Sequence, residues 1–529
     1  MKKLLCAVIS AAMLAGCSAP AIQTTQPAQS VTDDTTAVRW TLEKGGLEIQ
    51  VPEGMAENAI TAANDIIYYE AGHGGDYGEG ENWEAHTAEE AARHTVVHIN
   101  APGTYVLSGK LEAGQIAVDL GEEASEDPNA VVTLVLDGLD ITCTVAPAII
   151  FYNVYESGEP EGPAGANVIL AEGSQNYVNG SHVAKIYKPG TEKKLHKYDA
   201  AFYSRMSMNV GGEGCLEIQG DNEGLDSEMH LTIDSGEICI RSGNDGINAN
   251  ADGESVVTVN GGMLSITVTG ETGEGDGIDS NGWLYIKGGT VEAFACGSSM
   301  DSGVDADMGI IISGGNVLAT GNMLDTIDSG SQTYAVFNFA QTQTGGSYAL
   351  KNEKGTPVFD ITAPNAFTSL LYSAPALLVE GNYTLWSGQT QFEGMTGYGG
   401  GFAGFIGGGQ PIDRPDWPDR PGKGDGDVEI PPQPTNPVVT HGGTVQIPQG
   451  EQPENMPVPD FSGDFDPSQM PVPPMPQGGE QMPMPGMPNG VEPNGGGQGF
   501  VVMPVTGALS TEFPITRGAN YFSMVRPVE

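Results

Sequence analysis

One short pattern recurs along the middle of this sequence and restricts the fold more than any other feature. In GDGIDSNGWLYIKGG (275–289), an acid and a glycine precede Ile278, a second acid follows it, and a strand-like alternation ends in a Gly-Gly turn. Self-similarity at short, regular spacing indicates a protein built from stacked repeats. We call the position of Ile278 the central position of the repeat. In successive copies it is occupied by Phe202, Leu225, Ile247, Ile278, Val304 and Ile327, with spacings of 23, 22, 31, 26 and 23 residues.

Aliphatic residues alternate on both sides of the turn in each repeat. Leu284 and Ile286 come four and two residues before Gly288, and Val291 and Ala293 come three and five residues after it. A period of two predicts two short strands per repeat, each pointing every second residue inward. One repeat of 22 or 23 residues cannot bury that face alone, so neighbouring repeats must stack, with parallel strands about 4.8 Å apart. The pattern predicts an all-β fold, a parallel β-helix.

Other repeat architectures fit this period less well. TPR and ankyrin repeats have periods of about 33 to 34 residues with helical patterning, and a propeller blade needs about 40 residues or more. A β-sandwich with coincidental self-similarity is the alternative that the sequence leaves open.

The acids occupy two fixed positions, two residues before and one residue after the central position. Stacked in register, they would form two columns about 5 Å from coil to coil, where like charges disfavour ionisation unless a cation compensates. Oxygen ligands in flexible geometry suit Ca²⁺ better than Mg²⁺. The predicted calcium ligands, including one further acid nearby, are Asp226, Asp245, Asn248, Asp276, Asp279, Asp305, Asp307, Asp325 and Asp328.

Turn chemistry is the competing explanation for these acids. Tight turns need Asp, Asn and Gly on steric grounds, and Asx side chains cap such turns without metal. The recurrence of an acid or amide three residues apart in successive copies favours calcium over turn capping alone.

The charge balance restricts the partners. The chain has 21 Lys and Arg against 68 Asp and Glu, a formal net charge of −47. This charge argues against nucleic acid as a partner, because phosphate binding needs a basic face. Cations, or ligands bridged to the protein by cations, suit this charge better, and solubility outside the cell is the alternative reason for so much acid.

The N-terminus MKKLLCAVISAAMLAGCSAP reads as a secretory signal that is too short to be an ordinary spanning helix. Its Leu-Ala-Gly-Cys ending resembles the bacterial lipoprotein signal, which implies that Cys17 is lipidated and becomes the first mature residue. No later segment has about 18 or more consecutive apolar residues. We therefore expect a protein held at the bacterial cell envelope by a lipid and exposed on its surface.

Composition divides the chain into segments. We expect a signal peptide at 1–16, a lipid anchor and tether at 17–37, a cap region at 38–94 and the β-helix at 95–393. Residues 394–499, rich in Gly, Pro and Met, are predicted to be disordered because they have too little apolar surface to offset the ordering entropy. Strand-like alternation returns in 500–529. The sequence allows three disulfide connectivities among Cys143, Cys215, Cys239 and Cys296 and selects none of them. It does not indicate an oligomeric state.

The order of motifs resembles a family of secreted bacterial carbohydrate-binding proteins. The resemblance covers about residues 95–388. It depends on GTYVLSG (103–109), VTLVLDGLDIT (132–142), the tandem Asp-Gly-Ile coils and ALLVEGNYTLWSG (376–388). It implies a right-handed parallel β-helix that binds calcium and acidic or cellulosic plant polysaccharides. Tyr203, Asn248 and Ser302 replace acids of the two columns, so the coils that carry them would bind calcium weakly or not at all.

We therefore expect a non-enzymatic polysaccharide-binding protein, with Trp283 and Tyr285 pointing outward for stacking on sugar or for covering neighbouring side chains. A polysaccharide lyase or hydrolase is the first alternative. A lyase needs a basic side chain to remove a proton, and Arg205, Arg241 and Lys287 share no column. A structural or adhesive envelope protein is the second alternative.

Overall fold

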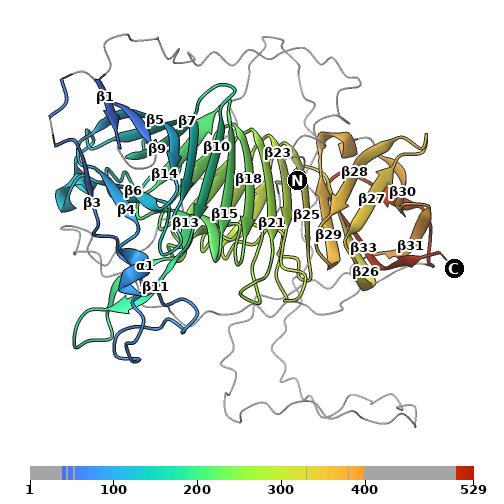
Figure 1. Cartoon of the computed structure of the whole chain (residues 1–529). Helices are drawn as coiled ribbons and strands as arrows, with labels where there is room; N and C mark the ends of the chain where they lie inside the picture. Colours follow the sequence, from blue (N-terminus) through green and yellow to red (C-terminus); the bar gives the residue numbers. More distant parts are fainter. Residues whose placement is uncertain are drawn as a thin grey trace, which may run out of the picture. The chain divides into compact units, whose positions relative to one another are not determined.

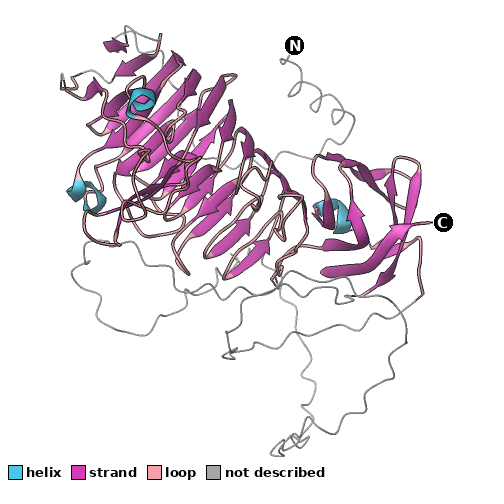
Figure 2. Cartoon of the chain, turned by 60° about the horizontal axis from the view of Figure 1, so that its bottom comes forward, coloured by secondary structure: helices cyan, strands magenta, loops and turns pink. Residues whose placement is uncertain are grey.

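The computed structural model describes residues 38–397 and 508–528, except for 43–45, 52–53, 57, 329 and 379. All described residues belong to one compact unit of the chain. Strands predominate (Figures 1 and 2), and the helices among these residues are short: α1 (Ala88–Ala91), η2 (Glu122–Glu126) and η3 (Pro375–Leu378). The predicted all-β class is confirmed.

The described residues include no helix that is long and apolar enough to cross a membrane. The expected signal peptide, the expected lipidation site Cys17 and the tether lie outside the described residues. Nearly all of the expected disordered segment, from residue 398 onward, lies outside them too.

Three parallel ladders of strands organise residues 95–321. Ladder A consists of β4 (Thr95–Ile99), β6 (Gly114–Asp119), β8 (Ile149–Asn153), β13 (Ala200–Ser204), β16 (Glu223–Ser227) and β19 (Ile247–Ala249). Ladder B consists of β5 (Gly103–Leu111), β7 (Val132–Thr142), β9 (Ala166–Leu170), β14 (Met208–Gly212), β17 (Leu231–Ile233), β20 (Val256–Val259), β22 (Trp283–Ile286) and β24 (Gly309–Ile312). Ladder C begins at the end of β7 and continues through β10 (Gln175–Gly180), β15 (Cys215–Gly220), β18 (Glu237–Ser242), β21 (Met263–Val268), β23 (Thr290–Phe294) and β25 (Asn316–Gly321).

Antiparallel strands accompany the first coils of the ladders. They are β1 (Val38–Thr41) and β2 (Glu48–Val51) beside β5, β3 (Ile60–Ala63) beside β4, and the hairpin of β11 (Val183–Tyr187) and β12 (Lys194–Tyr198).

The central position of the repeat lies on ladder A. Phe202 pairs with Leu225 and Leu225 with Ile247, and single bridges continue the row from Ile247 to Ile278 and from Ile278 to Val304. From Glu223 to Gly321 the chain visits ladders A, B and C in that order, again and again. The sequence predicted two strands per repeat, which correspond to ladders B and C. It missed the third ladder, because the Asp-Gly segments pair there over only a few residues.

The inward positions form one continuous core. The aliphatic residues expected to point inward before and after each turn, such as Leu231, Ile233, Ile238 and Ile266, are almost completely buried. They pack with the central residues of ladder A in a single apolar cluster.

Glycine before the central position is required by the close approach of neighbouring coils. A Cβ at Gly246 would lie 2.6 Å from the carbonyl oxygen of Gly277 and 2.1 Å from Cγ2 of Ile266. A Cβ at Gly277 would lie 2.3 Å from the carbonyl oxygen of Gly303. The absence of side chains here lets the acids on either side of the central position come close to those of the next coil.

Residues after Gly321 depart from the expected arrangement. The strands β26 (Tyr334–Gln343), β27 (Gly346–Lys351), β28 (Pro357–Ala363), β29 (Phe367–Ser373), β30 (Gly381–Ser387), β31 (Thr390–Thr396), β32 (Phe513–Ile515) and β33 (Ala519–Pro527) pair antiparallel, apart from β26 with β33. They enclose a second, aromatic-rich core. The parallel ladders therefore end at β25 instead of continuing to residue 393, because this part has hairpin-connected strands and lacks the Asp-Gly repeat.

Candidate functional site

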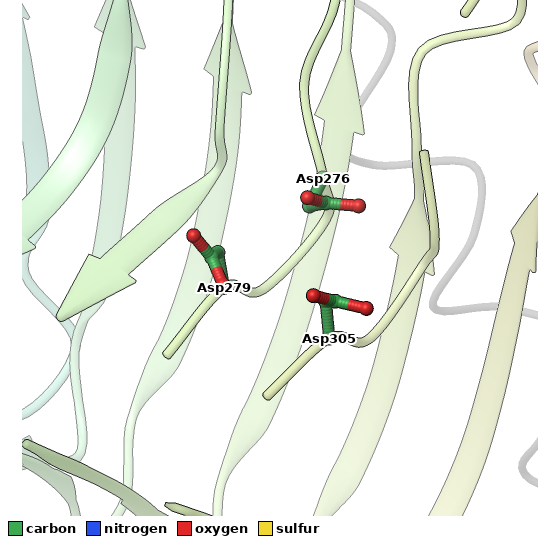
Figure 3. Close-up of side chains that lie close together, drawn as sticks. All are labelled: Asp276, Asp279 and Asp305. Atoms are coloured by element: carbon green, nitrogen blue, oxygen red, sulfur yellow. The ribbon is translucent and has the colours of Figure 1, made fainter. Parts of the chain in front are cut away.

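Ladder A gathers carboxylates from successive coils. Asp276 and Asp279 flank Ile278, and Asp305 follows Val304 in the next coil. Each of the three contributes an oxygen to a group whose atoms all lie within 4.8 Å of one another. Figure 3 shows the three carboxylates on adjoining segments of the chain. The sequence predicted all three, and the structure brings them together.

In Asp245 and Asp276, two acids that come before the central position, one oxygen already accepts a hydrogen bond from the backbone of the next coil. The Asp276 N–H donates to Oδ1 of Asp245 at 2.6 Å, and the Ser302 N–H donates to Oδ1 of Asp276 at 2.5 Å. Each such acid therefore ties its own coil to the next. These hydrogen bonds join successive coils and are not local turn caps, and the second oxygen of Asp276 has no hydrogen-bond partner among the described residues.

Burial and mutual repulsion disfavour ionisation of the cluster. Burial, with the charges of Asp245 and Asp307 nearby, raises the pKa of Asp279 to about 8. Burial, with Asp325 and Asp279, raises the pKa of Asp305 to about 8, and burial followed by Asp245 and Asp305 raises the pKa of Asp276 well above its ordinary value. Burial also raises the pKa of Asp245, to about 7. Among the described residues, no lysine or arginine forms an ion pair with the three clustered acids.

The coils before this cluster satisfy their acids differently. Glu223 accepts a hydrogen bond from Nδ2 of Asn248 at 3.1 Å, and both oxygens of Asp226 accept from Nδ2 of Asn250. Nζ of Lys197 lies 2.7 Å from Asp199, and the charges of Asp199, Glu223 and Asp226 raise the pKa of this lysine. An ammonium group thus supplies positive charge to these coils.

Two atoms in the same coils have no hydrogen-bond partner within the described part of the chain. They are Oε2 of Glu223 and Oδ1 of Asn248, both buried. Burial is the main cause that raises the pKa of Glu223 and Asp226 well above the ordinary values. Asp226 and Asn248, two predicted ligands, therefore lie in a separate buried group, outside the cluster of three.

The remaining predicted ligands do not extend the row. Ile327 pairs with Ile310 of ladder B and not with Val304, so the expected continuation of the central column to Ile327 is wrong. Asp325 accepts a hydrogen bond from the Ala306 N–H at 3.2 Å, and Asp328 from the Ile310 N–H at 2.9 Å. Asp307 is exposed. These departures arise because the chain leaves the repeat before β26.

The donor set of the cluster fits a hard divalent cation. Its three carboxylates are oxygen ligands of the kind that Ca²⁺ takes in flexible geometry. A divalent ion would also remove the repulsion that raises the three pKa values.

The two aromatic residues predicted to face outward lie on β22 and are half-buried. Their rings are nearly parallel, with centroids 6.0 Å apart and planes 12° apart. A Cβ at Gly309 would lie 2.8 Å from the ring of Trp283, and Nζ of Lys287 lies 5.7 Å from the ring centroid of Tyr285. The rings of Trp283 and Tyr285 therefore cover neighbouring groups and leave only part of their faces accessible.

A more exposed aromatic residue was missed by the sequence reasoning. Trp83 is 62% exposed, and its ring centroid lies 5.8 Å from that of His182. It belongs to an irregular segment before α1, where no alternation marks the outward side. Only its residue type could have signalled it.

The fold and site define an all-β protein whose stacked parallel strands carry a row of close carboxylates. Residues 93–349, which include all three ladders, match a family described as "Carbohydrate-binding domain-containing protein". The match supports a carbohydrate-binding domain in this part of the chain.

Two individual proteins are similar to parts of the chain. A "Carbohydrate-binding domain-containing protein" of Acetivibrio thermocellus is 30% identical over 147 residues, which are 28% of this chain and 45% of the relative. The match thus spans less than half of that protein's length. A solved structure of the polysaccharide lyase-like protein from C. thermocellum, in a gadolinium derivative, is 26% identical, covers 44% of this chain and 88% of that chain, and has a TM-score of 0.30.

Proposed function

We propose that this chain binds polysaccharide through calcium held by Asp276, Asp279 and Asp305. The observation that carries the proposal is the convergence of these three carboxylates, within 4.8 Å, without a basic partner among the described residues. Calcium would supply positive charge between these acids and the carboxylates of an acidic polymer such as polygalacturonate. Without such a bridge, the net charge of −47 would repel that polymer.

We also infer that the three ladders form a right-handed parallel β-helix. The inference is supported by the constant order in which the chain visits ladders A, B and C. It is supported further by the strong preference of parallel crossover connections for the right-handed sense. Such a solenoid would present an extended face suited to a polymeric ligand.

The proposed place of action is the bacterial cell surface, with the lipid on Cys17 as the anchor. The support for it is the lipoprotein-like signal in the first residues. The role proposed is binding and not catalysis, because the family description names binding and because two of the three basic candidates lie away from the acid-bearing ladder A. Arg241 lies on β18 of ladder C, and Lys287 directly follows β22 of ladder B.

The test compares the wild-type chain with an Asp279→Asn, Asp305→Asn double variant. Calcium binding is measured by isothermal titration, and retention on polygalacturonate and cellulose is measured with calcium and with EGTA. Asp137→Asn with Asp360→Asn is the matched control, because both residues are exposed and lie on β7 and β28.

We expect the first double variant to lose calcium binding and calcium-dependent retention, and the control to keep both. Equal calcium binding in all three proteins would contradict the site. Calcium binding without retention of any polysaccharide would contradict the function and favour an adhesive role. New unsaturated or reducing ends released from the polymer would instead indicate an enzyme.

A further inference from the structure

A hollow at the ends of the ladder C strands plays no part in the proposed calcium site. Its volume is about 210 Å³, and Asn179 of β10, Gln219 of β15 and Arg241 of β18 are among the residues that line it. These residues pair in register on three successive coils, Asn179 with Gln219 and Gln219 with Arg241. They therefore form one row, with a spacing of about 4.8 Å from coil to coil.

The side chains of this row are available to a ligand. All three are exposed, and among the described residues none of the three side chains has a hydrogen-bond or ion-pair partner. An amide offers both a donor and an acceptor, and a guanidinium offers several donors in a fixed plane. The row can thus form many hydrogen bonds that the protein itself does not use.

Acids line the same hollow and restrict the ligand's charge. Asp221 accepts hydrogen bonds from Oγ of Ser181 at 2.5 Å and from Nδ1 of His182 at 3.0 Å, and Glu271 is exposed. An anionic ligand at Arg241 would lie against these carboxylates, and a cation would lie against the guanidinium. A neutral molecule with many hydroxyl groups can donate to the acids and accept from Arg241 at once.

An exposed aromatic residue is connected to this hollow through His182. Trp83 is the most exposed large apolar residue of the described part, and its ring approaches His182, the neighbour of the lining residue Ser181. His182 holds the segment in place, because its two ring nitrogens contact Glu84 at 2.9 Å and Asp221 at 3.0 Å. An exposed aromatic face beside convergent polar groups suits a sugar ring, which is apolar on one face and polar at its edge.

We propose that this hollow is a calcium-independent subsite for a neutral sugar residue, with Arg241, Gln219 and Asn179 bonding its hydroxyls and Trp83 covering one face. This subsite depends on the proposed function in one respect, namely that the ligand is a carbohydrate. Thr269 and Glu271 line the hollow and Asp276 lies a few residues further along the same segment, so one polymer could meet both sites.

The test measures binding of neutral hexasaccharides (cellohexaose, xylohexaose and mannohexaose) by isothermal titration to the full chain in EGTA. The variants are Arg241→Ala, Gln219→Ala and Trp83→Ala. Glu217→Ala is the matched control, because Glu217 is an exposed residue of β15 two positions before Gln219. Thermal melts establish that each variant is folded.

At least one neutral hexasaccharide should bind in EGTA, with affinity about tenfold lower in Arg241→Ala and Trp83→Ala, because each loses a hydrogen-bonded or stacked contact. Glu217→Ala and the Asp279→Asn, Asp305→Asn double variant should bind as the wild type does. Absence of all neutral binding, or equal affinity in all variants, would overturn the subsite. Calcium-dependent retention of polygalacturonate alongside that result would leave the proposed function standing.

Discussion

Two groups of coils carry the same acidic motif and balance its charge in different ways. In the coils around Glu223 and Asp226 the acids are buried beside Lys197 and the amides of Asn248 and Asn250. In the coils around Asp276, Asp279 and Asp305 the acids are partly exposed, and no basic side chain of the described residues pairs with them. A repeated motif therefore does not imply a repeated site, since the surroundings of each copy decide whether protein groups compensate its charge.

His182, like Lys197, supplies positive charge to the acids of the early coils. It is 5% exposed and lies between Glu84 and Asp221, whose hydrogen bonds and charges overcome the opposing effect of burial and raise its pKa to about 10. The early coils thus use two protein cations, one at Lys197 and one at His182.

The largest expected effect comes from removing His182. His182→Ala leaves Glu84 and Asp221 without their shared cation and should lower the free energy of unfolding by about 3 kcal/mol. Because the folded pKa of His182 is raised, its contribution to the free energy of unfolding is complete below the unfolded pKa of 6.5. The protein loses this contribution as the pH rises toward 10. Urea unfolding at pH 6 and pH 9.5 measures both effects. A variant as stable as the wild type at pH 6 would show that His182 is not an internal cation.

The next effect separates the two groups of acids. Asp305→Asn should lower calcium affinity on the order of 100-fold, because even outer partners of metal ligands change affinity about 10- to 100-fold. Asp226→Asn should change it far less, since Asn250 already occupies both oxygens of Asp226. Calorimetric titration of both variants makes the comparison. Equal losses would mean that the early coils bind calcium as well.

The pH dependence of the calcium-free protein should show the cost of the uncompensated cluster. Asp279 and Asp305 have folded pKa values of about 8 against an ordinary value of 3.8, so the folded state binds more protons than the unfolded state between these limits. Stability in EGTA should therefore fall by about 2 kcal/mol as pH rises from 4 to 8, after allowance for solvent screening. Calcium should restore most of the loss. Curves that do not respond to calcium would count against a metal at this place.

The smallest effect tests Lys197. Its side chain is 44% exposed, so Lys197→Met should cost only about 1 kcal/mol of unfolding free energy. The loss should be larger at pH 8 than at pH 5, because burial raises the pKa of Glu223 and Asp226, so that these neighbours are more fully ionised at the higher pH. Chemical denaturation at the two pH values measures it, with Lys188→Met, a lysine in the loop of the same hairpin, as the control.

Much of the repeat could be predicted from the sequence. Period-two aliphatic residues and glycine turns fix which residues point inward, and the register of Phe202, Leu225, Ile247, Ile278 and Val304 agrees with the sequence spacing. The prediction that Ile327 continues the central column was wrong, because the spacing of repeats in a sequence does not show where the chain leaves the stack.

The surroundings of each site could not be predicted in the same way. Lys197 comes from a hairpin before the repeats, and Trp83 comes from an irregular segment more than 90 residues before the strands that it approaches. No local pattern reports such long-range contacts. The cluster of three acids was predictable because its members occupy the two acidic positions of the repeat, two residues before and one residue after the central position.

The C-terminal sheet has a consequence for how this protein is made. β33 pairs with β26 and β31, yet residues 398–507 intervene between β31 and β32 in the chain. Phe513, Phe522 and Val525 are buried in the second core, so that core lacks one wall until the ribosome has produced residues 513–527. A chain stalled or truncated before that point would expose an unfinished sheet edge, and a mature chain cut within residues 398–507 would keep β33 bound through its partners alone.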